Sequence, residues 1–154
     1  MKILSFTKNG NPNCLGGIET FQRNLYKIFG EEIKFLTFKS QNRGKYFNIK
    51  NIVEFDLKKN FFVKFLIKLV GKSNYIYYIA KRMLKKNTIL VLNSPNDIRK
   101  LYKLNCKKIL VQHNTLENYK KSFIKKSLNV PIMIRKYVDC YVFLSKYDQE
   151  KFIK

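Results

Sequence analysis

A glycine pair between an apolar segment and an amphipathic segment is the first feature of this sequence that could do chemistry. Residues 2–8 (KILSFTK) have the composition of a buried strand, and Gly16-Gly17 follows them across a polar loop. From Ile18 onward, apolar residues recur at helical spacing up to Gly30. A glycine turn between a strand and a helix leaves backbone N–H groups beside the positive end of the helix dipole, which favours an anion such as phosphate. A tight turn without a ligand is the alternative.

The only histidine of the chain is the second candidate. His113 follows another apolar segment, residues 107–112, and precedes the polar residues Asn114 and Thr115. An imidazole at a strand end can hydrogen-bond a substrate hydroxyl or a sugar oxygen, or act as a base near neutral pH. The alternative is a histidine on the surface or at a helix cap. His113 and its polar neighbour Asn114 are therefore candidate site residues.

Several common catalytic and cofactor patterns are missing from the sequence. Gly16-Gly17 lacks the further glycines of a dinucleotide-binding fingerprint, and Gly71-Lys72-Ser73 lacks the first glycine and the strand of a Walker A loop. No G-x-S-x-G motif supports a Ser–His–Asp triad, and no D-x-D motif is present to hold a metal on a diphosphate. The three cysteines have no metal-binding spacing, so with a single histidine we expect no metal site and no cofactor.

Apolar strands alternate with helical patterns along the chain. Strands are expected at residues 2–8, 33–39, 51–57, 88–93, 107–112 and 140–144. Helices are expected at residues 18–29, 60–86 with a break at Gly71, 117–128 and 131–137, and after the capping-box patterns Ser94-x-x-Asp97 and Ser145-x-x-Asp148. Such an alternation predicts one doubly wound α/β domain with a mostly parallel sheet covered on both faces. Ligands of these sheets bind at the carboxyl ends of the strands, where both candidates are expected.

One segment of the chain combines apolar and basic residues. In residues 58–86, an apolar stripe is formed by Phe61, Phe65 and Leu69 with the neighbouring Phe62 and Leu66. Lysines such as Lys64 and Lys68 are assigned to the opposing side. A basic amphipathic helix can lie in a membrane interface. We expect the stripe to pack on the sheet, with the lysines facing either solvent or a membrane.

The charge of the chain is strongly positive. Its 154 residues contain 32 Lys+Arg against 10 Asp+Glu, a formal net charge of +22. A field of this size attracts polyanions, either nucleic acid or an anionic lipid surface. The excess of lysine, asparagine, isoleucine, phenylalanine and tyrosine also matches the output of a genome rich in A and T, which is the non-functional alternative. With no visible signal peptide and no paired cysteine spacing, we expect a cytoplasmic protein.

Four motifs in the order and spacing of this chain resemble the N-terminal, Rossmann-like domain of GT-B glycosyltransferases, in particular the retaining group known as family 4. The resemblance covers essentially the whole chain. The motifs are Lys2-Ile3-Leu4 leading to Gly16-Gly17-Ile18-Glu19, the loop Asn93-Ser94-Pro95-Asn96, the strand end Val111-Gln112-His113-Asn114, and the segment from Val138-Asp139-Cys140 to Ser145.

The resemblance implies one wall of an interdomain cleft, in which the glycine turn approaches the donor diphosphate and the histidine lines the sugar site, without a metal. The chain would be residues 1–154 of an acceptor-side domain, cut at the domain boundary and inactive without a C-terminal donor domain or subunit. The candidate catalytic residue is His113, and the candidate donor-phosphate or substrate-binding residues are Gly16, Gly17, Glu19, Asn96 and Asn114.

We therefore expect a domain that helps move a sugar from a nucleotide-sugar to a glycan or lipid-linked acceptor. It would work in the cytoplasm, with peripheral attachment to the inner face of an anionic membrane. Two alternatives remain open. One is a basic, non-enzymatic module that binds nucleic acid, although no recognition motif for nucleic acid is present. The other is a catalytically dead remnant with a scaffold role.

Overall fold

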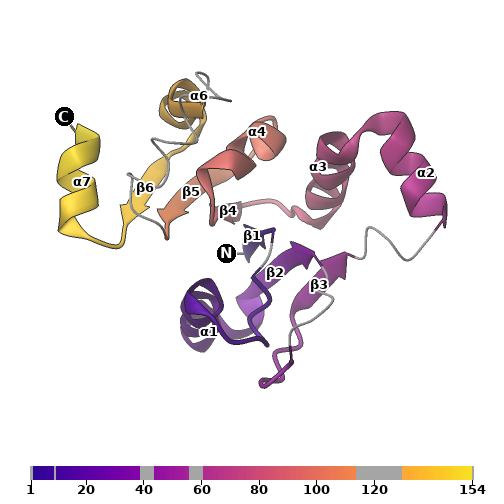
Figure 1. Ribbon diagram of the computed structural model, residues 1–154, viewed down its shortest axis with the longest axis horizontal. Helices are drawn as coiled ribbons and strands as arrows, with labels where there is room; N and C mark the ends of the chain where they lie inside the picture. The colour runs from indigo at the N-terminus through magenta and orange to yellow at the C-terminus, as the bar shows by residue number, and fades with distance from the viewer. Residues whose placement is uncertain (1, 9, 39–43, 56–60, 114–129, 154) are drawn as a thin grey trace.

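Six strands form one sheet in which all neighbouring strands are parallel (Figure 1). The computed structural model describes residues 2–8, 10–38, 44–55, 61–113 and 130–153. The strands lie in the order β3-β2-β1-β4-β5-β6, as expected of a doubly wound α/β fold. They are β1 (Lys2–Thr7), β2 (Ile33–Phe38), β3 (Ile52–Phe55), β4 (Thr88–Leu92), β5 (Lys107–Gln112) and β6 (Cys140–Phe143).

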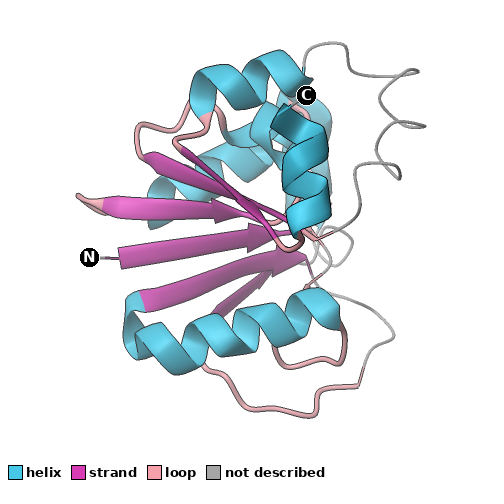
Figure 2. Cartoon of the chain, turned by 90° about the vertical axis from the view of Figure 1, so that its left-hand side faces the viewer, coloured by secondary structure: helices cyan, strands magenta, loops and turns pink. Residues whose placement is uncertain are grey.

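Helices cover both faces of the sheet (Figure 2). The helix α1 packs on one face, and α3, α4 and α6 contribute to the apolar cluster on the other. The expected helix at residues 117–128 lies outside the described residues. The helices are α1 (Gly17–Phe29), α2 (Phe61–Val70), α3 (Lys72–Met83), α4 (Ile98–Leu101), α6 (Val130–Tyr137) and α7 (Lys146–Ile153), with 3-10 turns η1 (Gly30–Glu32) and η2 (Pro95–Asp97).

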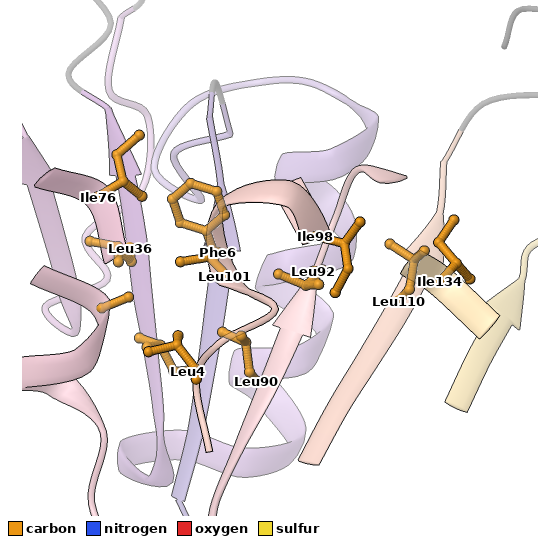
Figure 3. Close-up of a cluster of buried hydrophobic side chains, with 12 residues drawn as sticks. Leu4, Phe6, Leu36, Ile76, Leu90, Leu92, Ile98, Leu101, Leu110 and Ile134 are labelled. Carbon is orange, nitrogen blue, oxygen red and sulfur yellow. The ribbon is translucent and has the colours of Figure 1, made fainter. Parts of the chain in front are cut away.

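The central strands are apolar on both sides because both sides of the sheet are covered. In β1, Leu4 and Phe6 point into the larger cluster, which contains side chains of α3 and α4 (Figure 3). Ile3 points to the opposite side, where it joins Phe35 and Val91 beneath α1. Successive side chains of β1 thus enter apolar clusters on opposite faces of the sheet. The strand is therefore a continuous apolar run, as the prediction of the sheet assumed.

The order of the strands creates a switch point between β1 and β4. From β1 the chain moves outward to β2 and β3, and it then crosses back to place β4 on the other side of β1. The connections that leave the carboxyl ends of β1 and β4 therefore diverge, and a crevice opens between them in folds of this kind. The residues that follow β1, β4 and β5 all lie at this edge.

The break at Gly71 is confirmed, and the expected packing of the stripe before it is wrong. Gly71 has a φ of 80°, which separates α2 from α3. No residue of α2 is buried, and none of its side chains belongs to either core cluster. Of the predicted stripe, only Leu66 is half-buried. The other four side chains are exposed: Phe61, Phe62, Phe65 and Leu69. The helical spacing was correct, but spacing alone does not tell which surface covers the apolar side.

The two capping boxes behave differently. At the start of α7, the Ser145 hydroxyl accepts a hydrogen bond from the Asp148 backbone N–H at 3.1 Å and donates one to the Asp148 carboxylate at 2.7 Å. This box is confirmed. Ser94 makes no side-chain cap at η2, because the Asp97 N–H bonds its backbone carbonyl at 3.0 Å instead. That part of the prediction is wrong.

Candidate functional site

His113 follows β5 directly, and its ring lies against α1. The ring centroids of His113 and Phe21 are 4.9 Å apart at an interplanar angle of 74°, an edge-to-face contact. Phe21 lies four residues after Gly17, one turn further along the same side of α1. The contact brings the start of α1 beside the end of β5, so the glycine turn and the histidine share one edge of the sheet.

Asn93 connects three strands at this edge. It follows β4 and is buried, with only 3% of its surface exposed. Its Nδ2 donates to the Ser5 hydroxyl oxygen at 3.1 Å and to the Phe6 carbonyl at 2.9 Å, both in β1. Its Oδ1 lies 2.9 Å from Nε2 of His113. Asn93 therefore holds the imidazole in a fixed orientation relative to the central strands.

These hydrogen bonds also assign the position of the imidazole proton. The Phe6 carbonyl can only accept, so the atom of Asn93 that faces it is the amide nitrogen. The remaining Oδ1 can only accept, so Nε2 of His113 carries the proton and donates it. The other ring nitrogen, Nδ1, keeps its lone pair and has no partner among the described residues. It can accept a hydrogen bond from a hydroxyl group of a ligand.

Burial favours the neutral form of this ring. It lowers the pKa of His113 below the ordinary value of 6.5, since the charged form loses solvation. The imidazole is then neutral at pH 7 and acts as a hydrogen-bond acceptor or proton acceptor rather than as a cation.

A pH titration tests this assignment. Between the ordinary pKa and the lowered pKa, the unfolded chain binds more protons at His113 than the folded chain does, so this group destabilises the fold as the pH falls below about 6.5. We expect the melting temperature to fall from pH 7.5 to pH 5 by more in the native chain than in His113→Gln. Identical pH profiles of the two proteins would contradict the lowered pKa.

The two glycines have different structural roles. Gly16 has φ 149° and ψ 169°, a region that is essentially restricted to glycine. A Cβ on Gly16 would also clash with the carboxylate of Glu19. A Cβ on Gly17 would meet no atom within 4 Å, and its φ is not positive. The fold therefore requires Gly16, whereas Gly17 leaves open space beside the first turn of α1, where a ligand can approach the backbone.

Glu19 faces inward at the first turn of α1. It is buried, and its carboxylate lies against the Cα of Gly16. A negative charge at this position stabilises the positive end of the helix. The geometry supports a helix-stabilising role for Glu19, and an anion that binds at the turn has this carboxylate as a close neighbour.

The segment that precedes the glycine turn, residues 13–15, is held by contacts with residues 47–49 and with α1. The side-chain amide of Asn13 donates to the Ile49 carbonyl at 3.2 Å and accepts from the Ile49 N–H at 2.7 Å. Arg23 of α1 donates to the Cys14 carbonyl at 2.6 Å and lies over the ring of Phe47, 4.1 Å from its centroid. These contacts fix the loop from both sides, so the glycine turn has a defined position.

The other predicted site residues are less closely integrated. Asn96 is exposed in η2, at the same edge of the sheet after β4. Asn114 lies outside the described residues. Asn93, which the sequence analysis placed in a motif without giving it a role, makes the bond to the imidazole. The sequence does contain a feature that points to Asn93, because it is the first polar residue after a central apolar strand.

Two buried polar groups near this edge have no hydrogen-bond partner among the described residues: the side-chain amide of Gln22 and one carboxylate oxygen of Asp97. Gln22 is adjacent to Phe21 in α1, and Asp97 ends η2. Burial raises the pKa of Asp97, against the opposing effect of Lys100 at 3.1 Å. Ordered water molecules are the simplest partners for such groups.

Comparisons with protein families, with curated proteins and with solved structures gave no match to this chain. Within the described part of the chain, no three or more His, Cys, Asp or Glu side chains gather in a way that could hold a metal ion. Among the same residues, no helix is long and apolar enough to cross a bilayer. The function is therefore inferred from the residues at the carboxyl ends of β1, β4 and β5.

Proposed function

We propose that the chain is the acceptor-side domain of a retaining glycosyltransferase, which moves a sugar from a nucleotide-sugar to a glycan or lipid-linked acceptor. The bond between Asn93 and His113 is the observation that carries the proposal. It presents a neutral imidazole with its Nδ1 available to accept a hydrogen bond from a sugar hydroxyl. The parallel sheet, with this imidazole and a glycine turn at the carboxyl ends of its strands, fits the same proposal.

In this proposal the glycine turn stabilises the donor diphosphate. The backbone at Gly17 is open to approach, and the start of α1 adds the positive end of its dipole, which the neighbouring Glu19 carboxylate partly offsets. Negative charge that develops on the diphosphate as the sugar leaves would be stabilised there, and no metal is required. A second lobe that binds the nucleotide would close the cleft over His113. We also propose that the acceptor lies at the inner face of an anionic membrane, to which the basic chain attaches peripherally.

Magnetic resonance of the imidazole tests the proposal directly. The chain has a single histidine, so every imidazole signal belongs to His113. We expect nucleotide-sugars to shift these signals saturably and the isolated nucleosides to leave them unchanged. Asn105→Ala, at the opposite edge of the sheet before β5, is the control and should bind as the native chain does. If none of a panel of uridine and guanosine diphosphate sugars perturbs His113, the proposal fails.

A transfer assay gives the second test, with the nucleotide-binding lobe supplied in the same polypeptide or as a separate chain. We expect His113→Ala to lower the rate of transfer by about a hundredfold or more, because the side chain contacts the reacting sugar. The chain by itself should release no nucleotide from nucleotide-sugars. Full activity of His113→Ala would remove its assigned role.

A further inference from the structure

The outer side of α2 exposes a row of large apolar side chains. Phe61, Phe65 and Leu69 are 86%, 50% and 65% exposed. Their spacing of four residues places them in one line along the helix. Single exposed apolar residues are common on protein surfaces, whereas a continuous row of them marks a surface that contacts another apolar phase.

Packing of α2 against the other described residues does not explain this row. The helix contacts α3, and its less exposed side chains are Val63, Leu66 and Ile67. These residues lie on the side of the helix away from the exposed row, since they are offset from it by about half a turn. The contact with α3 therefore uses one apolar side of α2 and leaves the other in water. Figure 1 shows α2 beyond α3, away from the sheet.

Two lysines border the exposed row. Lys64 and Lys68 are both exposed, and each lies three residues after a member of the row, Phe61 or Phe65. They therefore flank the row, and the opposing side expected for them from the sequence is wrong. α2 contains no acidic residue. Long lysine side chains next to apolar groups place their charge at the level of lipid headgroups while the apolar groups enter the acyl region.

The charge of the chain selects among the possible partners. A second copy would bring a net charge of +22 against another +22, which opposes association through this basic surface. Nucleic acid would pair with the lysines through its phosphates but would leave the apolar row in water. An anionic bilayer satisfies both the lysines and the row.

We propose that α2 is the element that attaches the protein to an anionic lipid surface, with Phe61, Phe65 and Leu69 inserted among the lipids and Lys64 and Lys68 at the headgroups. This inference rests on the membrane part of the proposed function and is independent of the sugar site. The row lies parallel to the helix axis, so α2 lies in the plane of the interface.

A single tryptophan reports on this contact, because the chain has none of its own. In Phe65→Trp, we expect phosphatidylcholine vesicles containing phosphatidylserine to shift the emission to shorter wavelength and brominated lipids to quench it. Ile28→Trp is the matched control, because Ile28 is also exposed but lies on α1, on the opposite side of the sheet. Its emission should stay unchanged. An unshifted emission in the Phe65→Trp variant, or an equal shift in the Ile28→Trp variant, overturns the proposal.

Sedimentation with the same vesicles gives the affinity. We expect Phe61→Ser/Phe65→Ser/Leu69→Ser to weaken binding by roughly tenfold or more, and Lys64→Gln/Lys68→Gln to weaken it by roughly tenfold. The pair Lys27→Gln/Lys34→Gln removes the same charge elsewhere and should have a smaller effect.

Three outcomes contradict a lipid contact at α2. One is an equal loss of affinity in both lysine pairs. The second is that duplex DNA shifts the emission of the Phe65→Trp variant. The third is that raising the protein concentration shifts this emission in the absence of vesicles. Because no sugar is present, these results are separate from the titration of His113.

Discussion

Gly16→Ala is expected to lower the free energy of unfolding by about 1–3 kcal/mol, and Gly17→Ala to leave it unchanged or slightly higher. The backbone of Gly16 has a φ of 149°, where a Cβ is strained, and the Glu19 carboxylate occupies the space that the Cβ needs. Gly17 has neither constraint. Urea denaturation of the two variants and of the native chain measures the difference.

The same pair separates structure from ligand binding. Gly17→Ala keeps the fold but puts a methyl group where we propose that the diphosphate approaches, so it should weaken the response of His113 to nucleotide-sugars. For the stability of Gly16→Ala, the double variant Glu19→Ala/Gly16→Ala is the control for the clash, because it removes the carboxylate and leaves only the backbone strain. If Gly17→Ala binds nucleotide-sugars as the native chain does, the ligand does not approach the backbone at this residue.

Asn93→Ala is expected to cost about 3 kcal/mol of stability and to change the state of His113. The substitution removes the partner of Nε2 of the half-buried His113. It also removes one of two donors to the buried Phe6 carbonyl, which keeps the Asn93 backbone N–H at 3.3 Å. Without the amide oxygen, the imidazole proton is no longer confined to Nε2, so nitrogen chemical shifts should report a mixture of the two neutral forms. The native chain should show the Nε2–H form alone.

The charge variant Asn93→Asp gives the complementary result. A carboxylate at 2.9 Å from Nε2 would stabilise the imidazolium and raise the pKa of His113 relative to the native chain. Asn105→Asp adds the same charge at the other edge of the sheet and should not do so. An unchanged His113 titration in Asn93→Asp would show that the amide does not contact the ring in solution.

The fold was largely predictable because the apolar strands carry a strong local signal. Every strand except β3 begins at the expected residue, and the break at Gly71 follows from a glycine inside a helical pattern. The ends of β1, β4 and β6 were each predicted one residue too long, because side-chain composition does not say where pairing with the neighbouring strand stops.

The candidate site was predictable in its location but not in its connections. Strand order brings the ends of β1, β4 and β5 together, and the pattern of elements indicated this edge. The bond from Asn93 to His113 joins residues twenty positions apart, and nothing in their local sequence requires it. The position of α2 was missed for a related reason: a helical stripe predicts that one side is covered, and it is the same stripe whether protein or lipid covers it.

The glycine between α2 and α3 marks the limit of the packed core. Since α2 supplies no side chain to the core and is connected through a residue with φ 80°, it can change direction or unwind while the sheet keeps its packing. The most apolar helix of the described chain thus adds no side chain to either core cluster and contacts only the outer helix α3 among the elements that it packs against most. Forces acting on that helix at a surface would tilt it at Gly71 before they strained the strands that carry the imidazole.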